Sequence, residues 1–134
     1  MRKLAATAFA LLAVAATASQ PQINESAIEV YYRSFDKTSI VNLDAEALMG
    51  AHDRHLFISK RSQVKALLSA LGQPCNSAPP WQAQDLRLLI LVRGAHPWRW
   101  EASSFAYRDG RTGATCLLFS SQQSHLLALL GLER

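Results

Sequence analysis

The hydrophobic positions of the chain follow two periods, which together predict a mixed domain of strands and helices. Between Ser26 and Arg33, apolar and polar residues alternate, as expected for a strand with one buried face. From Ser59 to Leu71 the apolar residues recur with a helical period, ending just before Gly72. A second leucine-striped helix is predicted over Ser121–Leu130, with Leu126, Leu129 and Leu130 on one face and Gly131 as its stop.

The other apolar segments predict the rest of a sheet. Leu86–Arg93 is apolar at nearly every position, which is typical of a central strand covered on both faces. Shorter strands are predicted at Ser39–Leu43, Arg54–Ser59, Ala102–Arg108 and Ala114–Phe119, the last two joined as a hairpin by a glycine-bearing turn. Asp44 is expected to cap a short helix that ends at Gly50. We therefore predict an α+β fold, a mainly antiparallel sheet with two helices packed on one face.

Two segments of the chain resemble each other. Phe57–Leu68 and Phe119–Leu130 share six of twelve residues at a constant offset of 62, and both lead from a strand into a helix. One interpretation is an internal duplication of a β-hairpin-and-helix unit. The alternative is convergence, because serine caps and leucine stripes are common wherever a strand leads into a helix.

The N-terminus has the pattern of a cleaved export signal. Arg2 and Lys3 precede the apolar run Leu4–Ala16, and Ala16-Thr17-Ala18 supplies the small residues that signal peptidase accepts. The run is shorter than the roughly 20 residues that span a bilayer. We expect residues 1–18 to be removed and residues 19–134 to form one domain that is periplasmic or secreted, without stable membrane insertion.

Removal of that segment changes the charge. The chain has 14 Lys and Arg against 10 Asp and Glu, a net charge of +4, and loss of Arg2 and Lys3 leaves 12 against 10, or +2. The remaining basic residues are scattered, with only Lys60 and Arg61 adjacent. A nucleic-acid partner requires a basic stripe or patch, so we do not expect one.

The two cysteines are expected to be structural. An exported protein meets an oxidising compartment, and an even cysteine count favours a disulfide between Cys75 and Cys116. The alternative is a reactive thiol. Cys116 lies in an apolar strand-like segment without a basic neighbour that would lower its pKa, so the disulfide is favoured.

The chain offers little recognisable catalytic chemistry. It has no phosphate-binding glycine loop, nucleophile elbow, paired-histidine zinc motif or C-x-x-C, and we predict no cofactor and no metal site. The most metal-like cluster is His52-Asp53-Arg54-His55, which would need a further ligand such as His96 or His125. Solvated loop histidines are the simpler interpretation.

The segment around Trp98 is the main binding candidate. In an extended chain Trp98 and Trp100 share one face, while Arg99 projects from the other. Paired tryptophans can anchor a protein partner or stack on sugar rings, and they can equally cover the edge of the core.

These observations leave a binding protein and an enzyme as competing hypotheses. We expect a small exported, non-enzymatic protein that binds a protein of the cell envelope, such as an inhibitor or immunity protein, through Trp98, Arg99 and Trp100. The first alternative is a small envelope hydrolase built from the dispersed histidines. The second is a cell-wall glycan binder that uses Trp98 and Trp100.

Overall fold

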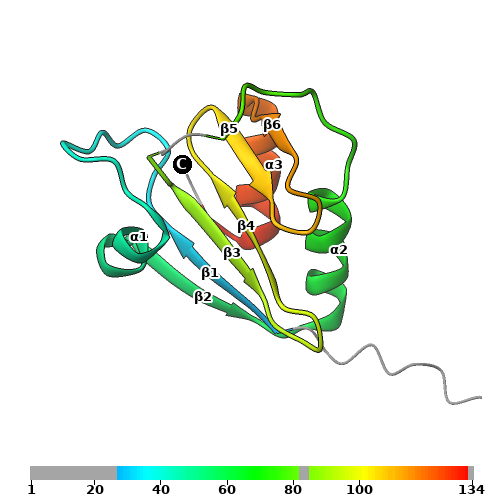
Figure 1. Cartoon of the computed structure of the whole chain (residues 1–134). Helices are drawn as coiled ribbons and strands as arrows, with labels where there is room; N and C mark the ends of the chain where they lie inside the picture. The colour runs from blue at the N-terminus through cyan, green and yellow to red at the C-terminus, as the bar shows by residue number, and fades with distance from the viewer. Residues whose placement is uncertain (1–26, 82–84, 133–134) are drawn as a thin grey trace, which may run out of the picture.

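The structure is a computed structural model that describes residues 27–81 and 85–132. The elements, in chain order, are β1 (Ile28–Tyr32), α1 (Ala45–Ala51), β2 (Arg54–Ile58), α2 (Arg61–Leu71), β3 (Leu88–Val92), β4 (Trp98–Ala102), β5 (Ala106–Asp109), β6 (Thr115–Leu117) and α3 (Ser120–Leu130) (Figure 1). The predicted export signal, residues 1–18, lies outside the described residues. Within the described ranges no helix is long and apolar enough to cross a membrane.

The six strands form one antiparallel sheet in the order β2-β1-β3-β4-β5-β6. The apolar strand β3 lies inside the sheet, between β1 and β4. Leu88 and Ile90 pack into the core on one face of the sheet and Leu89 into a second cluster on the other, so β3 is buried on both sides as its sequence predicted. The predicted α+β fold with a mainly antiparallel sheet is therefore confirmed.

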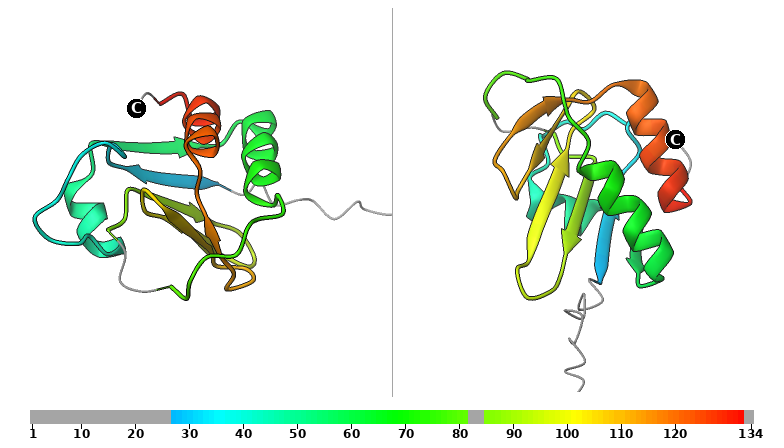
Figure 2. Two further views of the ribbon diagram at one scale, coloured as in Figure 1. Left: turned by 90° about the horizontal axis from the view of Figure 1, so that it is seen from above. Right: turned by 90° about the vertical axis from the view of Figure 1, so that its right-hand side faces the viewer.

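Helices α2 and α3 lie side by side on one face of the sheet (Figure 2). They contribute Val64, Leu67 and Leu71 from α2, and Leu126, Leu127 and Leu130 from α3, to the main core. The alternating residues of β1 supply the opposite wall of this core, since Ile28, Val30 and Tyr32 are all buried in it. Burial of an aliphatic side chain of this size contributes about 1.5–3 kcal/mol, so this interface contributes strongly to stability.

Helix α1 is separate from the other two and packs at one end of the opposite sheet face. Asp44 caps it as predicted, because its Oδ1 accepts a hydrogen bond of 2.8 Å from the Ala47 amide. Leu48 of α1 and Leu89 of β3 are fully buried together in a small second core. Helix α1 thus covers one end of this face, and no other helix of the described residues packs on it.

Some predicted boundaries differ from the structure. Residues 39–43 form a loop rather than a strand, and none of the six strands of the described sheet pairs with them. The predicted strand Ala102–Arg108 is divided by a tight turn between β4 and β5, in which the Ser103 hydroxyl accepts from the Ala106 amide at 3.1 Å. In α3 the buried stripe contains Leu127, whereas Leu129 is only half-buried.

The similarity of Phe57–Leu68 to Phe119–Leu130 has a structural counterpart in part. Each segment leads from a strand into one of the two paired helices, β2 into α2 and β6 into α3. The duplication itself stays a hypothesis, because the same arrangement follows from the leucine stripes alone.

Candidate functional site

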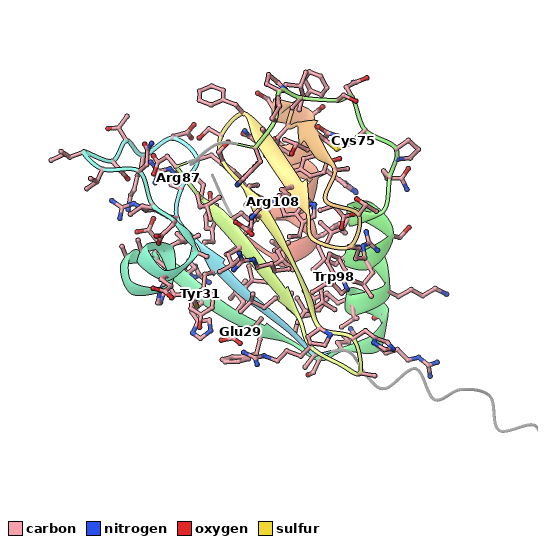
Figure 3. The ribbon with its side chains drawn as sticks, in the orientation of Figure 1. Glu29, Tyr31, Cys75, Arg87, Trp98 and Arg108 are labelled. Atoms are coloured by element: carbon pink, nitrogen blue, oxygen red, sulfur yellow. A yellow bond between two sulfur atoms is a disulfide. The ribbon has the colours of Figure 1, made fainter. Side chains whose placement is uncertain are left out.

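The sheet face opposite α2 and α3, here called the open face, carries an unusual set of charged residues. Its side chains come from the alternate positions of the strands that point away from the main core. Because of the strand register, Phe57, Glu29, Leu91 and Arg99 form one row across β2, β1, β3 and β4. A neighbouring row contains His55, Tyr31, Leu89, Glu101 and Arg108. Figure 3 looks onto this face, with Glu29 and Tyr31 at one side and Arg108 nearer the middle.

Glu29 and three residues around it form the first cluster on this face. The carboxylate of Glu29 accepts from the Tyr31 hydroxyl at 2.7 Å and from Arg93 Nε at 3.1 Å, and His55 Nε2 lies 2.8 Å away. The hydrogen bond from Tyr31 is the largest of the effects that hold the pKa of Glu29 down at about 2, followed by that from Arg93. The same bond raises the pKa of Tyr31. The tyrosine and histidine rings are stacked with their centres 4.1 Å apart, so the cluster is tightly packed.

Glu101 forms the second cluster with two arginines. One of its oxygens, Oε1, lies 2.7 Å from Arg99 Nε and 3.0 Å from Arg108 Nη2. The guanidinium carbon of Arg108 is also 5.1 Å from the centre of the Trp81 ring, a cation–π contact. Trp81, Arg99, Glu101 and Arg108 line a cavity of about 460 Å³ together with residues of the N-terminal part of α1 and the loop before it.

In the two clusters on this face, the charged groups nearest the solvent are arginines. The exposed acids Asp44 and Glu46 line the neighbouring cavity. The carboxylates of Glu29 and Glu101 lie beneath these arginines, with side chains only 8% and 6% exposed. Their arginine partners stand above them, with side chains 62%, 52% and 32% exposed for Arg93, Arg99 and Arg108. Each guanidinium is thus fixed by a buried acid and still presents part of its surface outward, an arrangement that suits recognition of an anionic group.

The tryptophans of the predicted binding segment lie on the other face. Trp98 and Trp100 share a face, as their alternation predicted, but that face is the one under α2 and α3. Trp100 is 1% exposed and stacks on Tyr107, with ring centres 4.8 Å apart. Because β4 is an internal strand and this face lies under the helices, the Trp100 ring is part of the main core. Of the predicted segment, Arg99 and part of Trp98 are accessible.

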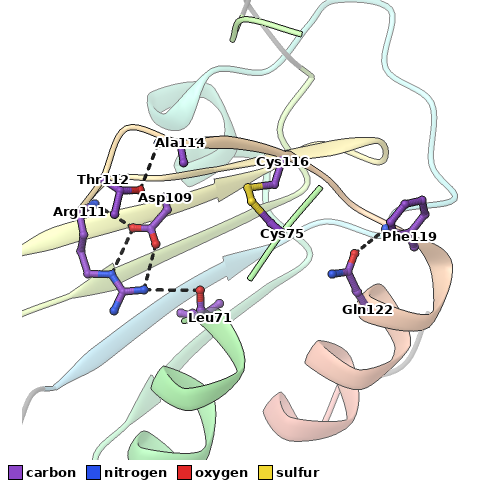
Figure 4. The surroundings of a disulfide bond; sticks show 9 residues. All are labelled: Leu71, Cys75, Asp109, Arg111, Thr112, Ala114, Cys116, Phe119 and Gln122. Atoms are coloured by element: carbon purple, nitrogen blue, oxygen red, sulfur yellow. Dashed lines mark hydrogen bonds and ion pairs between the residues drawn. A yellow bond between two sulfur atoms is a disulfide. The ribbon is translucent and has the colours of Figure 1, made fainter. Parts of the chain in front are cut away.

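Trp98 is covered by an arginine on the hairpin between β5 and β6. The guanidinium carbon of Arg111 lies 4.1 Å from the centre of the Trp98 ring. Arg111 is held there by Asp109, whose two oxygens receive Nε at 3.2 Å and Nη2 at 2.9 Å (Figure 4). Burial tends to raise the pKa of Asp109, but the hydrogen bonds from Arg111 outweigh it and the pKa is lowered. Gly110 permits the close approach of the hairpin to β4, because a Cβ there would lie 2.2 Å from the Arg99 carbonyl oxygen.

The candidate histidines converge only in part. The rings of His52 and His55 are 5.5 Å apart, and both contact Tyr31. Asp53 lies between them in sequence but is paired with Lys37, with 2.7 Å between Nζ and Oδ1. His96 is on the exposed loop between β3 and β4.

His125 is on α3, under the other face of the sheet, and lines a hollow of about 510 Å³ with Trp100 and residues of α2. Among the described residues, no three His, Cys, Asp or Glu side chains are grouped so that they could hold a metal ion. The hydrolase alternative therefore has two neighbouring histidines and one carboxylate, Glu29, that share a surface cluster.

The predicted disulfide between Cys75 and Cys116 is present (Figure 4). It joins the loop after α2 to β6, and the same loop is hydrogen-bonded along β6, with Leu117 N 2.9 Å from Asn76 O and Ala78 N 3.0 Å from Thr115 O. The loop thereby covers the outer edge of the sheet and leads towards Trp81 at the Glu101 cluster. The disulfide therefore restricts the positions that the loop after α2 can take.

Sequence reasoning did not identify Glu29, Arg93, Glu101 or Arg108 as site residues. The available indication was their position, because Glu29 falls at an outward position of a predicted strand and Glu101 shares the side of Arg99 in an extended segment, where a lone acid would be expected in solvent. Glu29 is covered by Arg93, which is 64 residues away in sequence, and Glu101 is covered in part by Arg108 of the neighbouring strand. Comparison of the chain with models of protein families, with curated proteins and with solved structures found no match.

Proposed function

We propose that this protein is an exported, non-enzymatic binding protein of the inhibitor or immunity type, and that it holds an acidic surface of a protein partner against its open face. The observation that carries the proposal is the layered charge of that face, with Glu29 and Glu101 buried below exposed arginines. Arginine side chains fixed in place lose less conformational entropy on binding than free ones. Tyrosine, tryptophan and arginine are also the residues enriched at the centres of protein interfaces, and Tyr31, Trp81 and Arg99 occur together here.

The other features of the chain support this function. The disulfide fits an oxidising compartment outside the cytoplasm. Most residues of the open face sit on strands, and Arg93 directly follows β3, so they are held more rigidly than residues of a long loop would be. The predicted export signal supports a place in the periplasm or outside the cell.

Capture from envelope extracts of the source cells with immobilised residues 19–134 tests this proposal. The matched baits are the wild-type protein, Arg93→Gln with Arg99→Gln on the open face, and Lys60→Gln with Arg61→Gln at the start of α2. Both variants lose two exposed positive charges. In the open-face variant His55 and Tyr31 still hold Glu29, and Arg108 still holds Glu101, so we expect the fold to persist.

The proposal predicts a saturable protein partner that the wild type and the α2 variant capture and the open-face variant captures much less. Capture should also weaken as ionic strength rises, since exposed charges are screened by salt. Equal capture by all three baits, or recovery of glycan alone, would contradict the proposal.

A further inference from the structure

The loop between β1 and α1 exposes two adjacent hydrophobic residues at its tip. Ile40 and Val41 are 106% and 72% exposed, whereas Leu43 at the end of the same loop is buried. Figure 1 shows the loop as the cyan segment that projects from the end of the sheet. A hollow of about 600 Å³ lies between this loop and the turn from β4 to β5, so the tip stands clear of the body on that side.

The base of the loop is held by a buried arginine. Arg87 is 2% exposed and donates from Nη2 to the Lys37 carbonyl at 2.7 Å and from Nη1 to the Ser39 hydroxyl at 3.0 Å. Its charge is balanced by Asp85, 2.6 Å from Nη2. A guanidinium that spans two points of one loop fixes the path of the backbone between them, in a way that a single-point contact does not. Figure 3 shows Arg87 at the root of this loop.

Further contacts hold both ends of the loop. On the entering side, Asp53 accepts from the Ser34 amide at 3.2 Å and pairs with Lys37. On the leaving side, the other oxygen of Asp85 accepts from the Leu43 amide at 2.9 Å, and the Leu86 amide donates to the Leu43 carbonyl at 2.8 Å. Both ends of the loop are thus held in place, and Ile40 and Val41 project from the part between them.

From this arrangement we infer that residues 36–42 form a preorganised recognition loop that inserts Ile40 and Val41 into an apolar pocket of the protein partner. Exposed hydrophobic side chains gain most by burial in a complementary pocket, and isoleucine and valine lose little side-chain entropy because their χ1 angles are restricted. The inference rests on the proposed protein-binding function and adds a second contact to the one on the open face.

The chemistry of the loop favours a protein pocket over a membrane surface. Segments that dock on anionic lipid combine basic residues with aromatic anchors. Residues 36–42 contain no aromatic residue, and their one basic residue, Lys37, is paired with Asp53. Acidic residues flank the tip instead, with Asp36 before it and Asp44 and Glu46 after it.

The test measures the affinity of the full mature protein for the partner isolated by capture, using variants of the tip and a matched control. Ile40→Ser with Val41→Ser removes both anchors, and Leu117→Ser makes the same type of change at an exposed apolar residue of β6. We expect at least a tenfold rise in Kd for the tip variant, an unchanged Kd for Leu117→Ser, and unchanged melting temperatures for both. Wild-type affinity in the tip variant would overturn the inference.

A second variant tests the bracing. Arg87→Lys keeps the positive charge beside Asp85 but lacks the second terminal nitrogen that donates to the loop. We expect this variant to fold, with faster amide exchange at residues 38–42 and a weaker partner complex. Unchanged exchange and affinity would overturn the role assigned to Arg87. Vesicles of phosphatidylethanolamine and phosphatidylglycerol complete the test, because binding of the wild type to them that is lost in the tip variant would assign the tip to lipid.

The outcomes for the two surfaces are separable. If the tip variant binds normally while Arg93→Gln with Arg99→Gln does not, the loop inference fails and the proposed function stands. If the tip variant alone loses binding, the loop inference stands and the open face is not the contact surface. If both keep full affinity, both proposals fail.

Discussion

Arg108 is held between Glu101 and Trp81, with Nη2 3.0 Å from the carboxylate and its guanidinium carbon 5.1 Å from the centre of the indole ring. The contact joins the middle of the sheet to the loop that follows the disulfide. It also divides the accessible arginines of the open face into two kinds. Arg108 is the more enclosed and acts as a structural tie, whereas Arg93 and Arg99 are more exposed and available to a partner.

Loss of the Arg108 tie should therefore reduce stability. We expect Arg108→Gln to lower the free energy of unfolding by about 1–2 kcal/mol, because a buried carboxylate loses a charged donor and Trp81 loses its cation. Urea unfolding measures this change. Lys65→Gln, at an exposed position of α2, is the control for loss of one charge and should stay within about 0.5 kcal/mol of wild type. An equal effect of the two substitutions on the free energy of unfolding would contradict the structural role of Arg108.

Glu29 should make folding stability depend on pH in the acid range. Its pKa is about 2 in the folded protein against 4.5 for an unperturbed glutamate, so its contribution is fully present above pH 4.5 and disappears as the pH falls through 2. Glu29→Gln should be less stable than wild type by about 2 kcal/mol at pH 6, through loss of charged hydrogen bonds. Denaturant titrations from pH 6 to pH 2 should show this difference shrinking, and a constant difference would argue against the assignment.

The disulfide should contribute strongly to stability. It closes a loop with a sequence separation of 41, for which the chain-entropy account gives about 4 kcal/mol. We expect the double variant Cys75→Ser with Cys116→Ser to melt well below the oxidised wild type. Reductant should lower the melting temperature of the wild type and leave the variant unchanged. Equal melting of the oxidised wild type and the variant would remove the disulfide from the stability account.

The two tryptophans of β4 should behave differently on truncation. Trp100→Ala leaves a cavity in the core beneath α2 and α3 and should cost about 3–5 kcal/mol. Trp98→Ala removes a half-buried ring under Arg111 and should cost clearly less. Thermal unfolding of the single variants distinguishes these values. A Trp100→Ala protein of wild-type stability would contradict the burial of that ring.

The period of hydrophobic residues was sufficient to predict most of the fold. Alternation in β1 correctly assigned Ile28, Val30 and Tyr32 to the core, and the unbroken apolar run of β3 correctly placed that strand inside the sheet. These predictions succeed because they depend on residues that are neighbours in sequence.

The candidate site was harder to predict because its contacts are not local. Alternation placed Trp98 and Trp100 on one face but could not show that this face lies under two helices. Likewise nothing near Glu29 in sequence indicates that His55 and Arg93 surround it, since strand pairing brings them together. Arg99 was predicted to bind a partner together with its tryptophan neighbours, and that role stays a prediction.

The most direct test of the open face is the dissociation constant of the purified partner complex, measured by calorimetry for the wild type, Arg93→Gln with Arg99→Gln, and Lys60→Gln with Arg61→Gln. The account predicts that the open-face variant binds about tenfold more weakly or worse, a loss of about 1.4 kcal/mol, while the α2 variant keeps wild-type affinity. Equal affinities for all three proteins would show that the arginines above Glu29 and Glu101 do not contact the partner.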